Sequence, residues 1–175
     1  MTRGPFMLPG PNPANQVRGA KAHDAGDAFE AWLATQHAVA RRRGLARVRK
    51  VSPAVRWMKI RGVTTAKVVG ENGADFVGIL RSGRALVAEA KASDDPTLGR
   101  SAFEDHQVAD LDAAAALGAL ALALVQLRID HRLRRFAAPW PLRWRERGRG
   151  AGVGLEELAP WEIREGECYL ERWAR

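Results

Sequence analysis

Three residues with the chemistry of a hydrolytic site lie close together in the chain. Asp75 is near the start of one short apolar run, and Glu89 and Lys91 end the next one. Because side chains alternate along a strand, Glu89 and Lys91 are expected on one face, with Ala88 and Ala90 on the other. A carboxylate and an ammonium group would then point into the same space.

The loop between the two runs decides whether Asp75 joins that face. A two-residue loop at Ser82-Gly83 would place Asp75 opposite Ala90, on the face away from Glu89. A three-residue loop over 81–83, with its glycine in the left-handed conformation, would place Asp75 directly opposite Glu89. The glycine stands where that turn needs one. The sequence therefore favours the second register, with both carboxylates on one face.

Two carboxylates on adjacent strands repel each other unless a cation lies between them, and a hard divalent ion with oxygen ligands meets this need. Mg²⁺ would fit, and Mn²⁺ is expected to substitute for it. Such an ion lowers the pKa of a bound water and polarises a phosphoryl oxygen, while Lys91 would orient the attacking water or neutralise charge on the phosphate. This chemistry is phosphodiester hydrolysis. The alternative is a surface hairpin with an exposed Glu and Lys, because D...ExK at loose spacing is common by chance.

The composition bounds the class of protein. A chain of 175 residues with 46% hydrophobic residues and six Trp suits one globular domain with a sizeable core. Lys and Arg outnumber Asp and Glu by 28 to 20, which gives a net charge of +8. This excess favours a nucleic acid partner, although a basic but inert surface is the other interpretation.

Two features of the sequence predict where the protein is found: it has a single cysteine, and it lacks a long apolar run. Cys168 alone can form neither an intramolecular disulfide nor a cysteine zinc site, which indicates a reducing compartment. The sequence has no signal peptide and no apolar run of about 18 residues. We expect a soluble, cytoplasmic protein, in the host cytoplasm if the chain is viral.

The N-terminal third is expected to consist of an arm and a helix. Residues 1–21 contain four prolines, three glycines and no apolar periodicity, so they are predicted to be a flexible basic arm before a single domain over 22–175. A helix should begin near Asp24, which can cap it, and end at Gly44. Glu30 flanks its apolar stripe. It is either an exposed surface residue or one that reaches round the core toward the two acidic residues of the hairpin.

A β-ribbon rich in basic residues is expected between this helix and the hairpin. Strand segments are predicted over 45–51, 55–60 and 62–69, with a bend at Pro53. The stretch 51–69 is suited to entering a groove or an opening in a nucleic acid. A sheet with a solvated basic face is the alternative. The candidate DNA-binding residues of the ribbon are Arg56, Lys59, Arg61 and Lys67.

The second half should supply a helix and a buried strand. A loop is expected over 94–100 and a helix over 101–117, because Ser101 with Glu104 three residues later has the pattern of a capping box. The nearly continuous apolar run over 119–127 is typical of a buried strand on the same sheet.

The order of these segments resembles a known family. A helix carrying GDAFEAWL is followed by the basic ribbon, then D-F-x-G, a strand ending in EAK, FEDHQVADL opening a helix, and an apolar strand. This order is similar to the RecU-type Holliday junction resolvases of the PD-(D/E)xK nuclease superfamily. The resemblance covers residues 26 to about 127.

The resemblance implies a fold and a set of roles. The fold would be an α/β domain with a central mixed sheet flanked by helices, restriction-endonuclease-like, with a projecting basic β-ribbon as the stalk that enters the junction. Asp75 and Glu89 would be metal ligands and Lys91 the catalytic lysine. Glu30 would add its carboxylate to the metal site, and Gln107 would lie near it.

The function expected from these observations is a Mg²⁺-dependent, structure-selective DNA endonuclease that resolves four-way junctions. A homodimer is expected, because symmetric resolution requires cuts in two strands. One alternative is a restriction- or repair-type nuclease of the same superfamily, and another is a DNA-binding module whose hydrolytic site is inactive.

Overall fold

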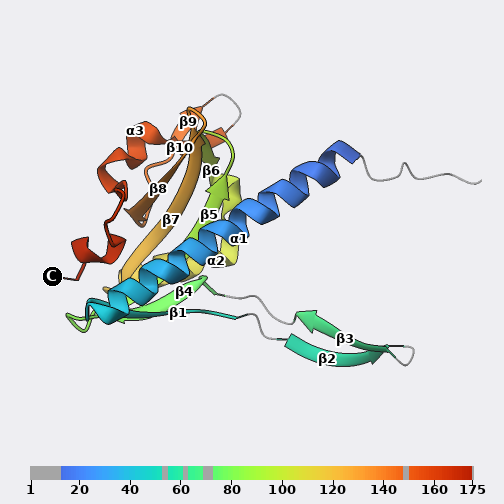
Figure 1. The fold of residues 1–175 in the computed structure, drawn as a ribbon, viewed down its shortest axis with the longest axis horizontal. Helices are drawn as coiled ribbons and strands as arrows, with labels where there is room; N and C mark the ends of the chain where they lie inside the picture. Colours follow the sequence, from blue (N-terminus) through green and yellow to red (C-terminus); the bar gives the residue numbers. More distant parts are fainter. Residues whose placement is uncertain (1–12, 53–54, 61–62, 69–72, 148–149, 175) are drawn as a thin grey trace, which may run out of the picture.

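The computed structural model describes residues 13–52, 55–60, 63–68, 73–147 and 150–174. A five-stranded sheet forms its centre (Figure 1), with strand order β1-β4-β5-β7-β8. Only β5 and β7 pair in parallel, while the other neighbours are antiparallel. The sheet is therefore mixed, as expected. Its strands are β1 (Ala46–Lys50), β4 (Phe76–Leu80), β5 (Ala85–Ser93), β7 (Leu120–Ile129) and β8 (Arg132–Pro139).

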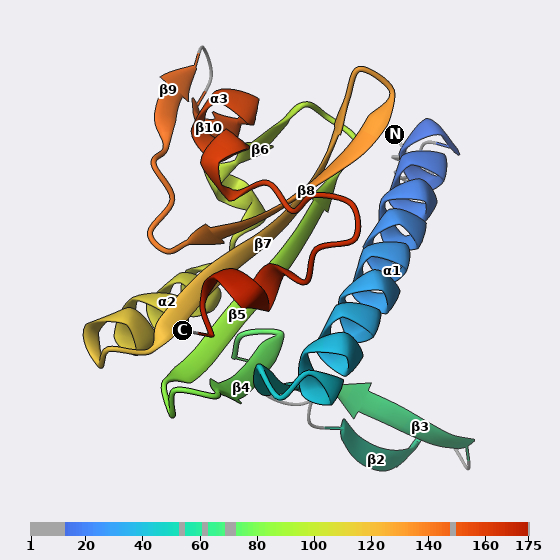
Figure 2. The ribbon, with the colours of Figure 1, turned by 60° about the vertical axis from the view of Figure 1, so that its left-hand side comes forward.

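The two long helices lie on opposite sides of this sheet (Figure 2). The helix α1 (Pro13–Arg42) packs through Phe29 and Leu33 against Leu86 and Ala88 of β5. The helix α2 (Asp105–Ala116) packs against the other face, where Val87 lies. Side chains alternate along β5. Leu86 and Ala88 therefore face α1, whereas Glu89 and Lys91 lie on the α2 side with Val87.

The helix α1 ends where the sequence predicts but begins earlier. Gly44 has φ +65°, and Leu45 N–H donates to Ala40 O at 2.9 Å, so the helix closes with a left-handed glycine. Its first residue is Pro13, so Asp24 lies inside the helix and the prediction that it caps the helix is wrong. Proline suits the first turn of a helix, which explains the early start. The part of the predicted arm over 13–21 is therefore helical, while residues 1–12 lie outside the described part.

The predicted ribbon is present as a separate two-stranded sheet. Strands β2 (Val55–Ile60) and β3 (Val63–Val68) pair antiparallel and project away from the central sheet (Figure 1). The register places Arg56 opposite Lys67, and Lys59 opposite Thr64. The predicted bend at Pro53 and the candidate DNA contact at Arg61 lie outside the described residues.

The segment before α2 differs from the prediction. The expected loop contains the strand β6 (Thr97–Gly99), followed by the 3-10 turn η1 (Arg100–Ala102). Phe103 is extended and buried, and this interrupts the helix expected from Ser101. The N-terminal contact forms one turn later, where Glu104 N–H donates to Gln107 Oε1 at 3.0 Å. The capping box predicted for Ser101 and Glu104 is wrong.

A smaller sheet and several short turns complete the domain. The strand β10 pairs with both β6 and β9. No helix in the described ranges is long and apolar enough to span a membrane. The remaining elements are β9 (Arg145–Arg147), β10 (Gly150–Gly154), α3 (Leu155–Leu158), η2 (Ala159–Trp161) and η3 (Tyr169–Arg172).

Candidate active site

The β4–β5 hairpin has the register that unites the two carboxylates. Phe76 pairs with Ala88, which places Asp75 opposite Glu89. The turn is the predicted three-residue one, because Leu80 N–H donates to the carbonyl of Arg84 at 2.9 Å. Gly83 within it has φ +85°, a conformation in which a side chain would be strained. The predicted geometry of this hairpin is confirmed.

Glu89 contacts both Asp75 and Lys91. The backbone N–H of Asp75 donates to Glu89 Oε2 at 3.1 Å, and Ala90 N–H donates to Asp75 Oδ2 at 2.9 Å. Lys91 Nζ lies 2.8 Å from Glu89 Oε1. Each carboxylate is thus held by a backbone amide of the neighbouring strand, and this fixes the orientation of both side chains.

Glu89 is held in an environment that disfavours its charge. The residue is 0% exposed. Burial first, and then the negative charge of Asp75, raise the pKa of Glu89 to about 7, although Lys91 opposes the rise. Glu89 Oε1 is a buried oxygen whose partner is the Lys91 ammonium group. The buried carboxylate thus faces one positive charge, from Lys91, and one negative charge, from Asp75.

A divalent cation fits this pair of carboxylates, because the charge of Asp75 repels that of Glu89. The carboxylates of Asp75 and Glu89 would hold it, with waters and backbone carbonyls supplying further ligands. Mg²⁺ suits such a site, because it commonly binds through one or two carboxylates and keeps several of its waters. Within the described residues, no group of three or more Asp, Glu, His or Cys is placed to hold a metal. The acidic part of the site is therefore this pair.

Lys91 is positioned by an aromatic residue as well as by Glu89. Its Nζ lies 5.5 Å from the centroid of the Phe103 ring, within the range of a cation–π contact. Phe103 in turn packs against Trp140 and Trp144 on the α2 face. This support keeps the ammonium group beside the Glu89 carboxylate.

Glu30 lies beside a different lysine. Its carboxylate forms an ion pair with Lys50, the last residue of β1. No hydrogen bond of the described residues joins Glu30 to Asp75 or Glu89. The pKa of Lys50 is raised mainly by Glu30, with further contributions from the charges of Asp75 and Asp27. The ion pair between Glu30 and Lys50 is a contact that the sequence did not predict.

Gln107 has a local structural role. Its side-chain carbonyl accepts the hydrogen bond that caps α2, and no hydrogen bond in the described structure joins it to Asp75, Glu89 or Lys91. Its place near the chemistry stays a prediction, as do the roles of Arg56, Lys59 and Lys67 on the ribbon.

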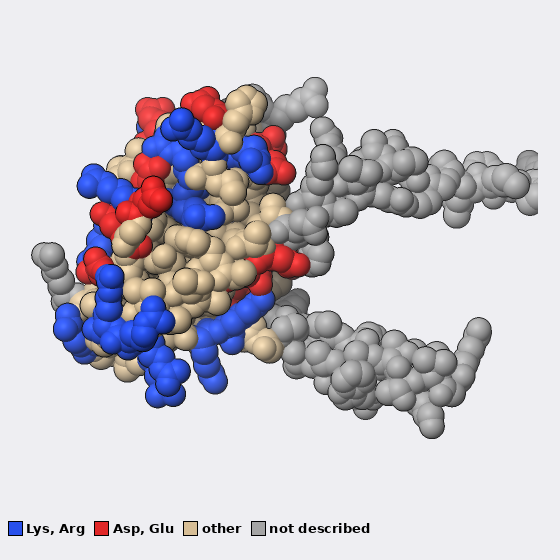
Figure 3. All heavy atoms as spheres, in the orientation of Figure 1, with Lys and Arg blue, Asp and Glu red and all other residues tan. Residues whose placement is uncertain are grey.

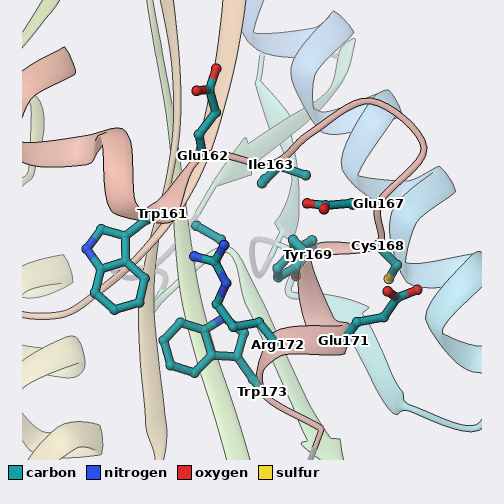
Figure 4. Close-up of a pocket in the computed structure, with 10 residues that line it drawn as sticks. Trp161, Glu162, Ile163, Glu167, Cys168, Tyr169, Glu171, Arg172 and Trp173 are labelled. Carbon is teal, nitrogen blue, oxygen red and sulfur yellow. The ribbon is translucent and has the colours of Figure 1, made fainter.

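A separate hollow lies beside the edge strand β8 (Figure 4). Its volume is about 390 Å³, and Trp161, Tyr169 and Trp173 line it, together with several glutamates. Two of these glutamates are paired, Glu162 with Arg134 and Glu171 with Arg43. None of the predicted catalytic residues lines this pocket. The chemistry expected from the sequence belongs to the hairpin.

The comparisons with known proteins bear on the fold. No family model matches the sequence, and no curated protein matches it. Among solved structures, the chain is similar to Hjc of Archaeoglobus fulgidus, a Holliday junction resolvase from an archaeal hyperthermophile, with a TM-score of 0.51. The sequences are 15% identical, and the match covers 82% of this chain and 94% of Hjc. The mixed sheet and its flanking helices therefore share the fold of that resolvase.

Proposed function

We propose that the protein is a divalent-metal-dependent DNA endonuclease that resolves four-way junctions as a homodimer. The observation that carries this proposal is the hairpin site, where the buried carboxylate of Glu89 contacts both the backbone of Asp75 and the ammonium group of Lys91. The PD-(D/E)xK fold and the likeness to a resolvase support the same class of reaction.

The residues of the chain divide the work of hydrolysis. Asp75 and Glu89 hold a divalent ion, which when bound activates a water and polarises the scissile phosphate. Lys91, held between Glu89 and Phe103, donates to the attacking water or to a phosphate oxygen as negative charge develops there. Backbone amides fix both carboxylates, so little reorganisation is needed before the reaction.

The distribution of arginines supports a polyanionic substrate. Several arginines elsewhere are neutralised by glutamate or aspartate, for example Arg128 by Asp94. The arginines near the end of α1 and along the edge strand β1 are exposed and have no ion pair within the described residues. Lys and Arg side chains gather in this part of the surface in Figure 3. Uncompensated arginines on one edge suit contacts with DNA phosphates. They are Arg41, Arg42, Arg47, Arg49 and Arg81.

Cleavage of a synthetic four-way junction with Mg²⁺ tests the function. The variants Asp75→Asn and Glu89→Gln should bind the junction at least as tightly as the unmodified protein and should not cut it. The charge-matched control Glu165→Gln, on an exposed residue outside the site, should cut normally. Appreciable cutting by either site variant would contradict the assignment.

The same assay separates the alternatives. A linear duplex of the same sequence should be cut much more slowly than the junction. Equal cutting of both would indicate a restriction- or repair-type nuclease. Binding without cutting, with Mg²⁺ and with Mn²⁺, would indicate an inactive DNA-binding module.

A further inference from the structure

The ring of Phe103 lies beneath the ammonium group of Lys91 on the α2 face of the central sheet. Lys91 Nζ is over the ring, 5.5 Å from its centroid. The other partner of this ammonium group in the described structure is Glu89 Oε1, at 2.8 Å. Lys91 is therefore held by a carboxylate and by the face of an aromatic ring.

The short turn before α2 fixes the backbone of Phe103. Its N–H donates to the carbonyl of Arg100 at 3.2 Å, and Arg100 Nη1 donates to the carbonyl of Phe103 at 3.3 Å. Phe103 is 3% exposed. The turn η1 thus determines where the ring lies, and it places the ring inside the protein.

Two tryptophans pack against the ring of Phe103. The ring centroids of Trp140 and Trp144 lie 5.4 Å and 5.8 Å from that of Phe103, at interplanar angles of 48° and 74°. Trp140 is fixed in turn, because its indole N–H donates to Asp112 Oδ1 on α2 at 2.6 Å. The ring is therefore supported by buried neighbours while Lys91 lies over its face.

The contact with the ring suits a lysine that must act on a substrate. An aromatic face attracts a cation through its quadrupole, and the Lys91 side chain is only 19% exposed, so little water screens this attraction. Lysine has three N–H donors, and one contact with Glu89 leaves others for a water or a phosphate oxygen. A carboxylate that also holds a divalent ion attracts the ammonium group less strongly. The attraction of the ring does not depend on that ion.

We propose that Phe103 is a positioning residue, whose ring face keeps the Lys91 ammonium group at the reacting phosphate while Glu89 holds the metal. This inference rests on the proposed function. In this role Phe103 acts only through Lys91. It should therefore affect the rate of the chemical step and leave the affinity for the junction unchanged.

The simpler interpretation is that Phe103 only fills the core and that the aliphatic stem of Lys91 packs over it. In that case any apolar side chain of the same shape would serve. The two interpretations differ in electrostatics. Core packing depends on shape and apolar area, whereas the attraction of a cation depends on the negative charge of the ring face.

Replacing Phe103 by mono-, di- and trifluorophenylalanine tests the proposal, because fluorine withdraws charge from the ring face with little change in size. The kcat of junction cleavage should fall stepwise, by about fivefold for the trifluoro ring, with KM unchanged. The same series at Phe136 is the matched control, because this ring is buried and has no cation over it among the described residues. Its kcat should stay constant. Equal changes at the two positions would overturn the proposal.

A second measurement needs neither DNA nor catalysis. Protons over an aromatic face are shifted upfield in NMR spectra, and the chain has only five lysines, so the Cε protons of Lys91 can be resolved in labelled protein. Their signal should lie upfield of its usual position in the unmodified protein and return to that position in Phe103→Leu. Addition of Mg²⁺ should leave the upfield shift in place. Loss of the shift with Mg²⁺ would overturn the role of Phe103.

The results separate this inference from the proposed function. Junction cleavage by the unmodified protein, combined with a constant kcat across the Phe103 series, would overturn the role of Phe103 alone. Absence of cleavage by the unmodified protein, with Mg²⁺ and with Mn²⁺, would overturn both, because Lys91 would then have no reaction to assist.

Discussion

Glu89 is a residue at which stability and the proposed function oppose each other. Its pKa in the folded protein is about 7, above the ordinary value of 4.5. Between these values the folded state binds a proton that the unfolded state has released, so stability without metal falls as pH rises through this window. Below pH 4.5 the Glu89 carboxyl is protonated in both the folded and the unfolded state, so its burial no longer lowers the stability.

Glu89→Gln should therefore be more stable than the unmodified protein at pH 8 by about 1–3 kcal/mol, and equally stable at pH 4. Urea unfolding in the presence of a chelator measures the difference, and the titration of groups that do not interact with Glu89 cancels between the two proteins. A variant that is less stable at pH 8 would show that Glu89 gains more from Lys91 than its burial costs.

The same carboxylate predicts the pH dependence of cleavage. A divalent ion binds the ionised form of Glu89, so protons and metal compete for it. The rate of junction cutting should rise as pH increases through about 7. Because Mg²⁺ displaces the proton, a higher Mg²⁺ concentration should move the midpoint to lower pH. Rates measured against pH at two Mg²⁺ concentrations test this, and a midpoint independent of Mg²⁺ would contradict it.

The sequence predicts the hairpin residues better than those of the helix. The placement of Asp75, Glu89 and Lys91 depends on strand alternation and one turn glycine, which are local properties. The partner of Glu30 depends on how α1 packs on the sheet, and no spacing in the sequence encodes that angle. The Glu30–Lys50 pair could therefore not be predicted.

Among the elements, the position of β1 depends on how closely its backbone approaches β4 at Gly78. A Cβ placed on Gly78 would lie 2.6 Å from the carbonyl oxygen of Arg47 and 3.0 Å from the Cα of Val48. Both atoms belong to the backbone, so relief requires β1 to move. That strand carries Lys50 and the edge arginines, so a side chain at position 78 would move these residues as well.

Gly78→Ala should destabilise the domain by about 1–3 kcal/mol, the cost of an overpacked position. Gly26→Ala is the matched control, because a Cβ there meets nothing within 4 Å and the residue lies inside α1. That variant should gain up to about 1 kcal/mol from the higher helix propensity of alanine. Thermal unfolding compares the two. A Gly78→Ala protein as stable as the unmodified one would mean that β1 has room to shift.

The prediction of elements from the sequence failed where pairing between distant segments decides the structure. The central strands and both long helices follow from apolar patterns. The strand β6 does not, since its three residues become a strand by pairing with β10, which places Leu98 opposite Val153. The early start of α1 was missed for a different reason, because prolines and glycines near its beginning suggested an arm.

At the scale of the whole molecule, the unpaired arginines of the β1 edge predict that the affinity for DNA depends on salt concentration. Loss of a phosphate contact lowers the slope of log affinity against log salt by about 0.9 for duplex DNA. The double variant Arg47→Gln/Arg49→Gln should therefore reduce the slope by about 2. Junction binding by the non-cutting Glu89→Gln protein gives the measurement.

The control for this experiment removes the same charge elsewhere. Arg132→Gln/Arg164→Gln changes two exposed arginines that have no ion pair in the described part of the chain. Its slope should stay near that of the parent protein. Equal slopes for the two double variants would show that the β1 edge contributes only net charge.

The proposed junction substrate predicts how the molecule assembles. Resolving a four-way junction requires cuts in two strands of like polarity, and each chain has one set of Asp75, Glu89 and Lys91. A two-fold axis through a homodimer would supply both cuts with one gene product. A monomer would have to dissociate between cuts and would release half-cut junctions.

We therefore expect a homodimer that makes paired cuts. Sedimentation at micromolar concentration should give about twice the chain mass of 19.2 kDa. On a plasmid with an extruded cruciform, linear DNA should form without accumulation of nicked circles, because both sites act within the lifetime of one complex. Mixing the unmodified protein with excess Asp75→Asn protein should then yield nicked circles from heterodimers with one active site. A monomeric protein that releases mainly nicked circles on its own would contradict the paired mechanism, while the nuclease activity itself would stand.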